Sequence, residues 1–322
     1  MPEQQGVNVN TNTNAEAKTN IKNGAKVDFL FNELKNFQDI ATYIKPLSGE
    51  IPEINGMDIY GEVIPFNGVV GGDHIVYVDF NKRYDLDLRI REAQDQGRFD
   101  VVEKLNLNRR RAGVLLADVS GHNITDALLA AMLHQAFLTG VQYELKQNGE
   151  VTAELFEILN TRFFNSSSFS KFITLIYGEI WDNGNFNFIN AGHPPPVVFS
   201  NKYDKLIKIS HDRVVHFPPM GTLPSREDID SRCIESRIGY KKKYSVNNLN
   251  LMGNGDILLL YTDGLSEHTG EKEICYFPHK LEDILKRIKN DSARSIYLQL
   301  KENLLEFSGP SDDISIVVIK KL

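Results

Sequence analysis

The order of helix and strand patterns along this chain predicts an α+β fold in which antiparallel sheets are covered by helices. Three observations support that prediction. Short runs rich in β-branched and aromatic residues recur between turn residues, helical stretches separate groups of these runs, and the Asn183-Gly184 step joins two of them as a hairpin. The chain has 322 residues, of which 41% are hydrophobic, enough for a sizeable core.

The N-terminal part differs in composition from the rest. Residues 1–24 are rich in Asn and Thr and poor in large apolar side chains, which predicts a disordered tail. The segment 25–47 is predicted to contain an amphipathic helix, because apolar residues recur in it at alternating steps of three and four up to Ile44. Pro46 is expected to end this helix. Two interpretations of this helix stay open: it packs on its own domain, or it pairs with a second copy of the chain in a regulatory homodimer.

Residues 48–322 are predicted to form one domain. Its expected strands fall at 57–66, 71–80, 113–121, 172–182, 185–193, around 211–217, 256–264 and 314–321. Its expected helices fall at 124–145 and 151–164, with a further amphipathic helical stretch over 279–307. The number and order of these elements favour sheets covered by helices.

A charged insertion, residues 81–111, interrupts the first strands. It is dense in both signs of charge and has partly helical periodicity. It is either a solvated surface helix or a docking or regulatory element, and its place between two strands leaves open that it gates a site.

Composition excludes several classes of function. The net charge of -7 argues against nucleic acid as the main ligand, because such binding depends on clustered Lys and Arg. Cys233 and Cys275 lack metal-ligand spacing, so neither a disulfide framework nor a structural zinc site is expected. We expect no secretory signal and no membrane-spanning segment, and therefore a cytoplasmic protein.

Acidic residues stand at the ends of several expected strands. Asp-Gly steps are common in turns, so one such residue alone carries little weight. Together they would gather several carboxylates at one edge, where each would repel the others unless a cation were bound. These residues are Asp73 in VVGGDHIVYV, Asp118 in GVLLADVSGH, Asp263 in ILLLYTDGL, and Asp312 with Asp313 in GPSDDISIVVI.

Hard divalent cations suit such a group of oxygen ligands, so Mg2+ or Mn2+ is the expected cofactor. Two ions about 4 Å apart lower the pKa of a bridging water and stabilise in-line displacement at phosphorus. No phosphate-binding G-x-x-x-x-G-K-[ST] motif is present, which argues against a P-loop nucleotide enzyme. Ser120 lacks a partner base at a suggestive position, so we do not expect covalent catalysis.

Six motifs in order resemble the SpoIIE and RsbU branch of the metal-dependent phosphatase (PPM) family, which includes protein phosphatase 2C. The resemblance spans nearly all of residues 26–322. The motifs are P-x-I-x-G followed by GGD within 52–73, DVSGH at 118–122, NAGHPPP at 190–196, PMG at 219–221, GDILLLYTDGLSE at 255–267 and SDDISIVVI at 311–319.

This resemblance implies a four-layer α-β-β-α sandwich of two antiparallel sheets flanked by helices, with two metal ions in a cleft at one end. It implies metal-binding and catalytic roles for Asp73, Asp118, Asp263 and Asp312, and a further metal ligand in the backbone carbonyl of Val119. Asp118 would bridge the ions. The residues expected to surround these ligands are Gly72, Gly121, His122 and Asp313.

The resemblance also implies a protein serine/threonine phosphatase. Its substrate in this branch is typically a phosphorylated anti-sigma-factor antagonist of the STAS fold. Two alternatives stay open: a non-catalytic signalling scaffold with the same fold, and a hydrolase of small phosphate esters. His122 and His193 are candidate general acids, although both lie in Gly-His turns where a side chain can simply satisfy backbone groups.

Overall fold

The computed structural model describes residues 26–33, 35–36, 39–40, 50–66, 71–121, 124–166, 171–210, 213–227, 233–250 and 252–322. The chain divides into two compact units, Met1–Tyr43 and Ile44–Leu322. In the first unit, residues 26–33 are helical and their side chains are exposed. The predicted tail at 1–24 and the predicted helix end before Pro46 lie outside the described residues.

The second unit contains two five-stranded sheets in which all neighbouring strands are antiparallel. One sheet has the order β1-β10-β9-β6-β7 and the other has the order β2-β3-β4-β5-β8. The strands are β1 Met57–Ile64, β2 His74–Asp79, β3 Arg111–Val119, β4 Ile173–Trp181, β5 Phe186–Ala191, β6 Val197–Ser200, β7 Lys205–Lys208, β8 Asn247–Leu249, β9 Ile257–Tyr261 and β10 Ile314–Lys321.

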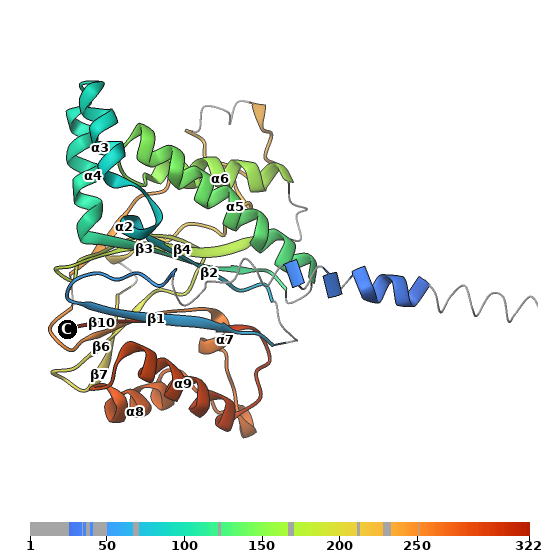
Figure 1. Cartoon of the computed structure of the whole chain (residues 1–322). Coiled ribbons are helices and arrows are strands. Elements are labelled where there is room, and N and C mark those ends of the chain that lie inside the picture. The colour runs from blue at the N-terminus through green and yellow to red at the C-terminus, as the bar shows by residue number, and fades with distance from the viewer. Residues whose placement is uncertain are drawn as a thin grey trace, which may run out of the picture. The chain divides into compact units, whose positions relative to one another are not determined.

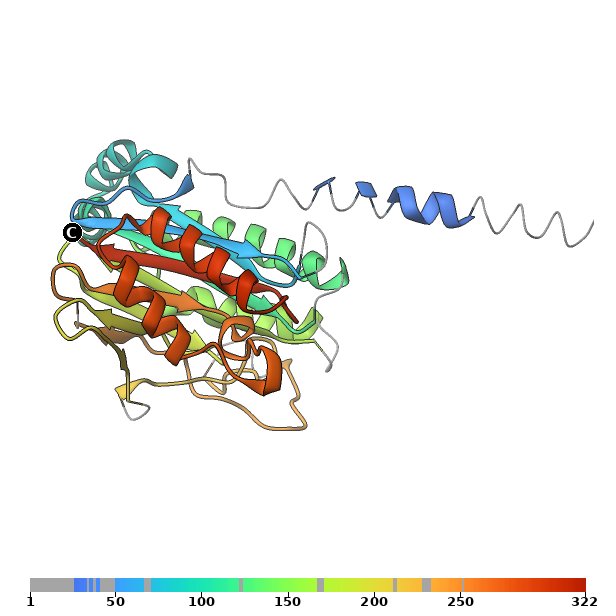
Figure 2. The same cartoon turned by 90° about the horizontal axis from the view of Figure 1, so that it is seen from below.

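Helices cover the outer faces of both sheets (Figure 1), and Figure 2 shows α8 and α9 lying side by side across the sheet that contains β1 and β10. On the opposite side of the unit, α5 and α6 cover the sheet that contains β3 and β4. The helices are α2 Phe80–Arg83, α3 Leu86–Asp95, α4 Phe99–Leu107, α5 Ile124–Gln147, α6 Ala153–Ser166, α7 Asp263–Ser266, α8 His279–Ile288 and α9 Ala293–Phe307. None of the helices in the described residues is both long and apolar enough to cross a bilayer.

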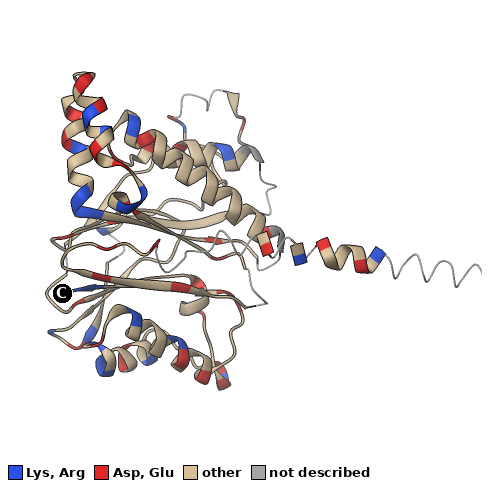
Figure 3. Cartoon of the chain, in the orientation of Figure 1, with Lys and Arg blue, Asp and Glu red and all other residues tan. Residues whose placement is uncertain are grey.

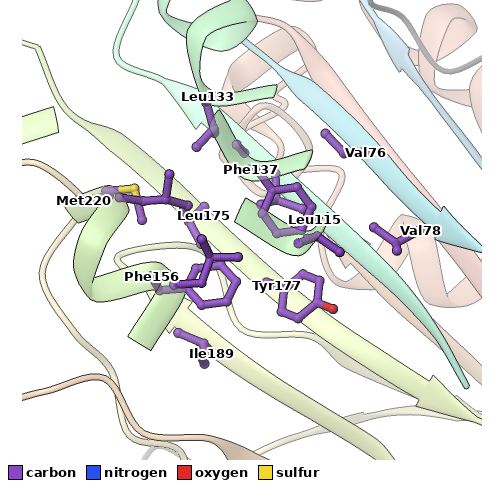
Figure 4. Close-up of a cluster of buried hydrophobic side chains, with 14 of the residues drawn as sticks. Val76, Val78, Leu115, Leu133, Phe137, Phe156, Leu175, Tyr177, Ile189 and Met220 are labelled. Carbon is purple, nitrogen blue, oxygen red and sulfur yellow. The ribbon is translucent and has the colours of Figure 1, made fainter. Parts of the chain in front are cut away.

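The buried apolar side chains form three layers: one between the two sheets and one between each sheet and its helices. Successive side chains of a strand point to opposite faces of its sheet. In β2, Ile75 and Tyr77 pack between the sheets, while Val76 and Val78 pack under α5 and α6. Figure 4 shows this second layer, where Phe137 and Phe156 meet Tyr177 of β4. A third layer lies between the other sheet and α8 and α9. The predicted four-layer sandwich of two antiparallel sheets flanked by helices is therefore confirmed.

One predicted strand is wrong. The segment around 211–217 forms no strand where it is described, and Phe217 makes only an isolated bridge to Ala191. The reason is that the side chain of Asn247 bonds both the N–H and the carbonyl of Val215, at 2.7 and 3.1 Å, in place of a neighbouring strand. The sequence patterns also missed the short strands β6, β7 and β8.

The charged insertion at 81–111 forms a hairpin of helices α3 and α4. Figure 3 shows acidic and basic residues interspersed along both helices. The insertion connects the end of β2 at Asp79 to the start of β3 at Arg111, whereas Asp73 and Asp118 lie at the other ends of these strands. A strand of six to nine residues is about 20 to 30 Å long, so the hairpin stands at the opposite end from these two carboxylates.

Candidate metal centre

Strand register brings the sequence-predicted acids to one end of the two sheets. His74 pairs with Ala117, which places the adjacent Asp73 beside Asp118 at the end of that ladder. In the other sheet, Tyr261 pairs with Ile316, so Asp263 follows β9 where β10 begins. Asp312 and Asp313 immediately precede β10. Each acid therefore lies at a strand end, where the chain leaves the core.

The buried carboxylate of Asp73 is held by two hydroxyl groups. Thr262 Oγ1 and Ser315 Oγ each donate to Asp73 Oδ2 at 2.7 Å. The same Thr262 oxygen accepts the Ser315 N–H at 2.9 Å. Asp73 is only 7% exposed, and burial followed by the nearby Asp118 raises its pKa well above the usual range. These hydroxyls join the two sheets at the acidic end.

Asp118 and Asp263 interact with each other directly. Burial, together with the charges of Asp263, Asp312 and Asp313, raises the pKa of Asp118 to about 7. Burial also raises the pKa of Asp263, followed by the effects of Glu267 and Asp312. The proximity of Asp263 favours the protonated form of Asp118, whereas that of Asp118 favours the ionised form of Asp263. A shared proton is how two neighbouring carboxyls coexist without a cation.

Asp312 and Asp313 differ in exposure and in partners. Asp312 is exposed, and its Oδ1 accepts the N–H of Asp313. Asp313 is buried, and its two oxygens accept the N–H groups of Phe66 and Gly72, each at 2.7 Å. Asp313 thus connects the start of β10 to the loop before Asp73.

The Gly72 turn lies against two backbone carbonyls of the turn that follows β3. A Cβ at Gly72 would stand 2.5 Å from the Gly121 oxygen and 2.7 Å from the Val119 oxygen, so only glycine fits there. Gly121 itself has φ +108°, which other residues rarely adopt. The Val119 carbonyl expected as a ligand therefore faces the Asp73 turn, while His122 lies outside the described residues.

The donor set fits a hard divalent cation, because it consists of carboxylate and carbonyl oxygens. Within the described part of the chain, no group of three His, Cys, Asp or Glu side chains is already gathered to hold an ion. A cation bound among these acids would compete with protons for the same carboxylate oxygens. The residues in place to hold ions are Asp118, Asp263, Asp312, Asp73 and the Val119 carbonyl.

Sequence patterns missed several residues that contact the acids. Thr262 and Ser315 are polar residues beside or within otherwise apolar strands, and that contrast was the available signal. Glu267 adds a further acid near Asp263. Lys171 and Asp126 form an ion pair beside the turn at 118–121, and nothing in their local sequence indicates it.

His193 belongs to a closed turn. The Asn190 side chain donates to the His193 carbonyl at 2.9 Å and accepts its N–H at 3.0 Å. Thr174 Oγ1 lies 3.0 Å from His193 Nδ1. Burial lowers the pKa of His193 to about 3, so the imidazolium form that a general acid requires is absent near neutral pH.

Comparison with known proteins gives a family match over most of the chain. The model for Stage II sporulation protein E (SpoIIE) matches residues 108–321. Phosphoserine phosphatase RsbP of Bacillus subtilis (strain 168) is 28% identical over 207 residues, covering 64% of this chain. The chain spans only 43% of the length of that relative.

Solved structures share the fold at low sequence identity. The SiaA-PP2C domain of Pseudomonas aeruginosa has a TM-score of 0.58 at 15% identity, covering 92% of this chain and 99% of that one. The RsbU and RsbW domains of a Mycobacterium tuberculosis protein have a TM-score of 0.57 at 20% identity, and the match covers 86% of this chain and 64% of that one. The matched family model and the two helix-covered sheets with their acidic strand ends lead to one conclusion: this chain belongs to the SpoIIE family and has the PPM phosphatase fold.

Proposed function

We propose that this chain is a metal-dependent phosphoserine and phosphothreonine protein phosphatase that uses two Mn2+ or Mg2+ ions. The observation that carries the proposal is the set of influences on Asp118. The strongest of them are burial and three neighbouring carboxyl groups, all of which oppose its ionised form. A divalent cation bound among these acids would stabilise their ionised forms.

Each acid has its own part in this proposal. Asp118 and Asp263 would hold the ions, and the Val119 carbonyl would supply a further, neutral oxygen. Asp312 is the most exposed ligand, and Asp73 is oriented by its two hydroxyl partners. When bound, two divalent ions supply a water of lowered pKa and neutralise the oxygens of the transferred phosphoryl group.

A protein substrate is favoured over a small phosphate ester. Asp312 and Glu267 are both exposed, so the acidic end is accessible at the surface, whereas small ligands are usually enclosed in a concave pocket. The similarity to a phosphoserine phosphatase supports phosphoserine as the residue from which phosphate is removed. Within this class we propose a phosphorylated regulatory protein, with a STAS-type antagonist as the substrate to test first.

The test follows phosphate release from a phosphorylated STAS-type protein and from p-nitrophenyl phosphate. We expect Mn2+-dependent release that favours the protein and is abolished by EDTA, by Asp118→Asn and by Asp263→Asn. Asp182→Asn is the matched control, because this acid pairs with Arg110 at the other end of the sheet. Release that persists through chelation and through both site substitutions would contradict the metal mechanism.

The non-catalytic scaffold makes a different prediction in the same assay. It would bind a phosphorylated partner and release no phosphate at any Mn2+ concentration. The gathered carboxylates weigh against it, because their mutual repulsion has a cost that partner binding alone does not require.

The N-terminal helix is proposed to pair two copies of the chain. Val27 and Leu30 stand one turn apart on it and are 62% and 56% exposed. Removing residues 1–45 should change the sedimentation coefficient or the regulation of the protein and leave Mn2+ affinity intact. An unchanged sedimentation profile together with unchanged activity would favour an ordinary helix without a pairing role.

A further inference from the structure

The turn at residues 118–121 is braced from outside by the start of the segment that leads into β4. Ser120 N–H donates to the Phe172 carbonyl at 3.0 Å, and Phe172 N–H donates to Ser120 Oγ at 3.1 Å. Lys171 Nζ donates to the Ser120 carbonyl at 2.9 Å. The N–H, the carbonyl and the hydroxyl of Ser120 are therefore all hydrogen-bonded to residues 171 and 172.

Lys171 also bonds the start of helix α5. Its Nζ lies 2.5 Å from Asp126 Oδ1, and Asp126 is fully buried in the first turn of that helix. Because Asp126 has no exposure to water, breaking its ion pair with Lys171 would be costly, and this contact holds the Lys171 side chain in place. The Lys171 side chain is 30% exposed and spans the gap between helix and turn.

These contacts determine where the Val119 carbonyl points. The peptide bond between Val119 and Ser120 is planar and trans, so its C=O and N–H point in opposite directions. Because the Ser120 N–H is held by Phe172, the Val119 oxygen is turned the other way, toward Gly72. Lys171 fixes the next peptide plane through the Ser120 carbonyl, and Gly121 lies against Asp126.

We propose that Lys171 and Asp126 are positioning residues for the metal centre: the pair holds the turn so that the Asp118 carboxylate and the Val119 carbonyl converge on the ions. This inference rests on the proposed metal-dependent function. Neither residue needs to touch an ion or the substrate, because the pair acts through the backbone of residues 119–121. Groups that orient metal ligands commonly change metal affinity by about 10- to 100-fold when they are removed.

The test measures Mn2+ affinity by titration calorimetry, with urea unfolding as the check that each variant is folded. We expect Lys171→Met to weaken Mn2+ binding by about tenfold. Asp126→Asn, which keeps the side-chain shape but loses the charge, should weaken it less. Lys171→Arg should recover most of the affinity, and kcat at saturating Mn2+ should change far less than the metal affinity.

A matched control is the buried ion pair between Lys241 and Glu157, 2.9 Å apart, whose further partners include the Lys242 carbonyl and the Tyr244 N–H. Lys241→Met should lower stability and leave Mn2+ affinity unchanged. If Lys171→Met does not fold, Asp126→Asn decides the question by the same measurement.

Three results would overturn the inference. Unchanged Mn2+ affinity in folded Lys171→Met or Asp126→Asn would remove the role of the pair alone, while wild-type binding preserves the metal centre. An equal loss in Lys241→Met would reduce the effect to general stability. Wild-type protein that binds no Mn2+ would overturn both this inference and the proposed metal centre.

Discussion

Strand β3 (Figure 1) begins at Arg111 and ends beside Asp118. The two ends differ in the charged partners of their acidic residues. At the first end, the buried Arg111 pairs with Glu179 at 2.9 Å and donates to Asn108, while its guanidinium lies 4.9 Å from the Trp181 ring centre. At the other end, Asp118 meets other acids, and its pKa rises to about 7.

The two ends differ in whether the chain itself supplies a cation for the buried acid. Burial raises the pKa of Glu179, but the Arg111 charge and the Tyr177 hydroxyl act in the opposite direction. At the first end, therefore, the chain itself supplies the cation that pairs with the buried acid, and this pairing contributes to stability. We call this the complete end. For Asp118 the strongest influences all favour protonation, so we call this the incomplete end. In the proposed metal centre a bound cation would offset these influences.

The largest effect on activity is expected when Asp118 is replaced at the incomplete end. Asp118→Asn should lower Mn2+-dependent phosphate release by about a thousandfold or more, equivalent to about 4 kcal/mol of transition-state stabilisation. The measurement is kcat/KM on a phosphoserine protein. Activity within tenfold of wild type would show that Asp118 is not a ligand.

Breaking the complete end should affect stability instead. Arg111→Met leaves Glu179 buried without its cation, which should lower the free energy of unfolding by about 3 kcal/mol. Urea unfolding measures this, and the Arg111→Met/Glu179→Gln double variant should regain part of the loss. Arg110→Met, at an exposed neighbouring pair, should have little effect. A loss of Mn2+ affinity in Arg111→Met would contradict the separation of the two ends.

The free energy of unfolding of the metal-free protein should depend on pH through the titration of Asp118 at the incomplete end. The pKa of Asp118 is raised from 3.8 to about 7, so the folded state binds more protons than the unfolded state between these values. Stability should therefore fall as pH rises from about 5 to 8, by on the order of 2 kcal/mol. The difference between wild type and Asp118→Asn isolates this group, and a difference independent of pH would contradict the raised pKa.

The smallest effect is expected at the hydroxyls that hold Asp73. Thr262→Val removes one donor to the Asp73 carboxylate and keeps the side-chain shape, so activity should fall by about tenfold. Ser315→Ala removes the other donor and should act similarly. Steady-state kinetics across Mn2+ concentrations measures both, and variants identical to wild type would show that Asp73 needs no such support.

The sequence predicted those strands whose own residues form a recognisable pattern. A run rich in β-branched residues placed β10 at residues 314–321, as found, and strand ends indicated where Asp73 and Asp263 lie. The segment at 211–217 misled because the distant side chain of Asn247 satisfies its backbone. The partners of Asp73 were missed for a related reason: Ser315 and Thr262 meet it only through register between strands far apart in sequence.

The most direct test of the contrast between the two ends is the free energy of unfolding of wild type and Asp118→Asn at pH 8, with EDTA and with Mn2+. In EDTA we expect Asp118→Asn to be more stable than wild type, because carboxylate repulsion is relieved. With Mn2+ we expect wild type to gain stability through binding and the variant to gain far less. A variant that is less stable in EDTA and gains as much from Mn2+ as wild type would contradict the assignment of this end as a metal centre.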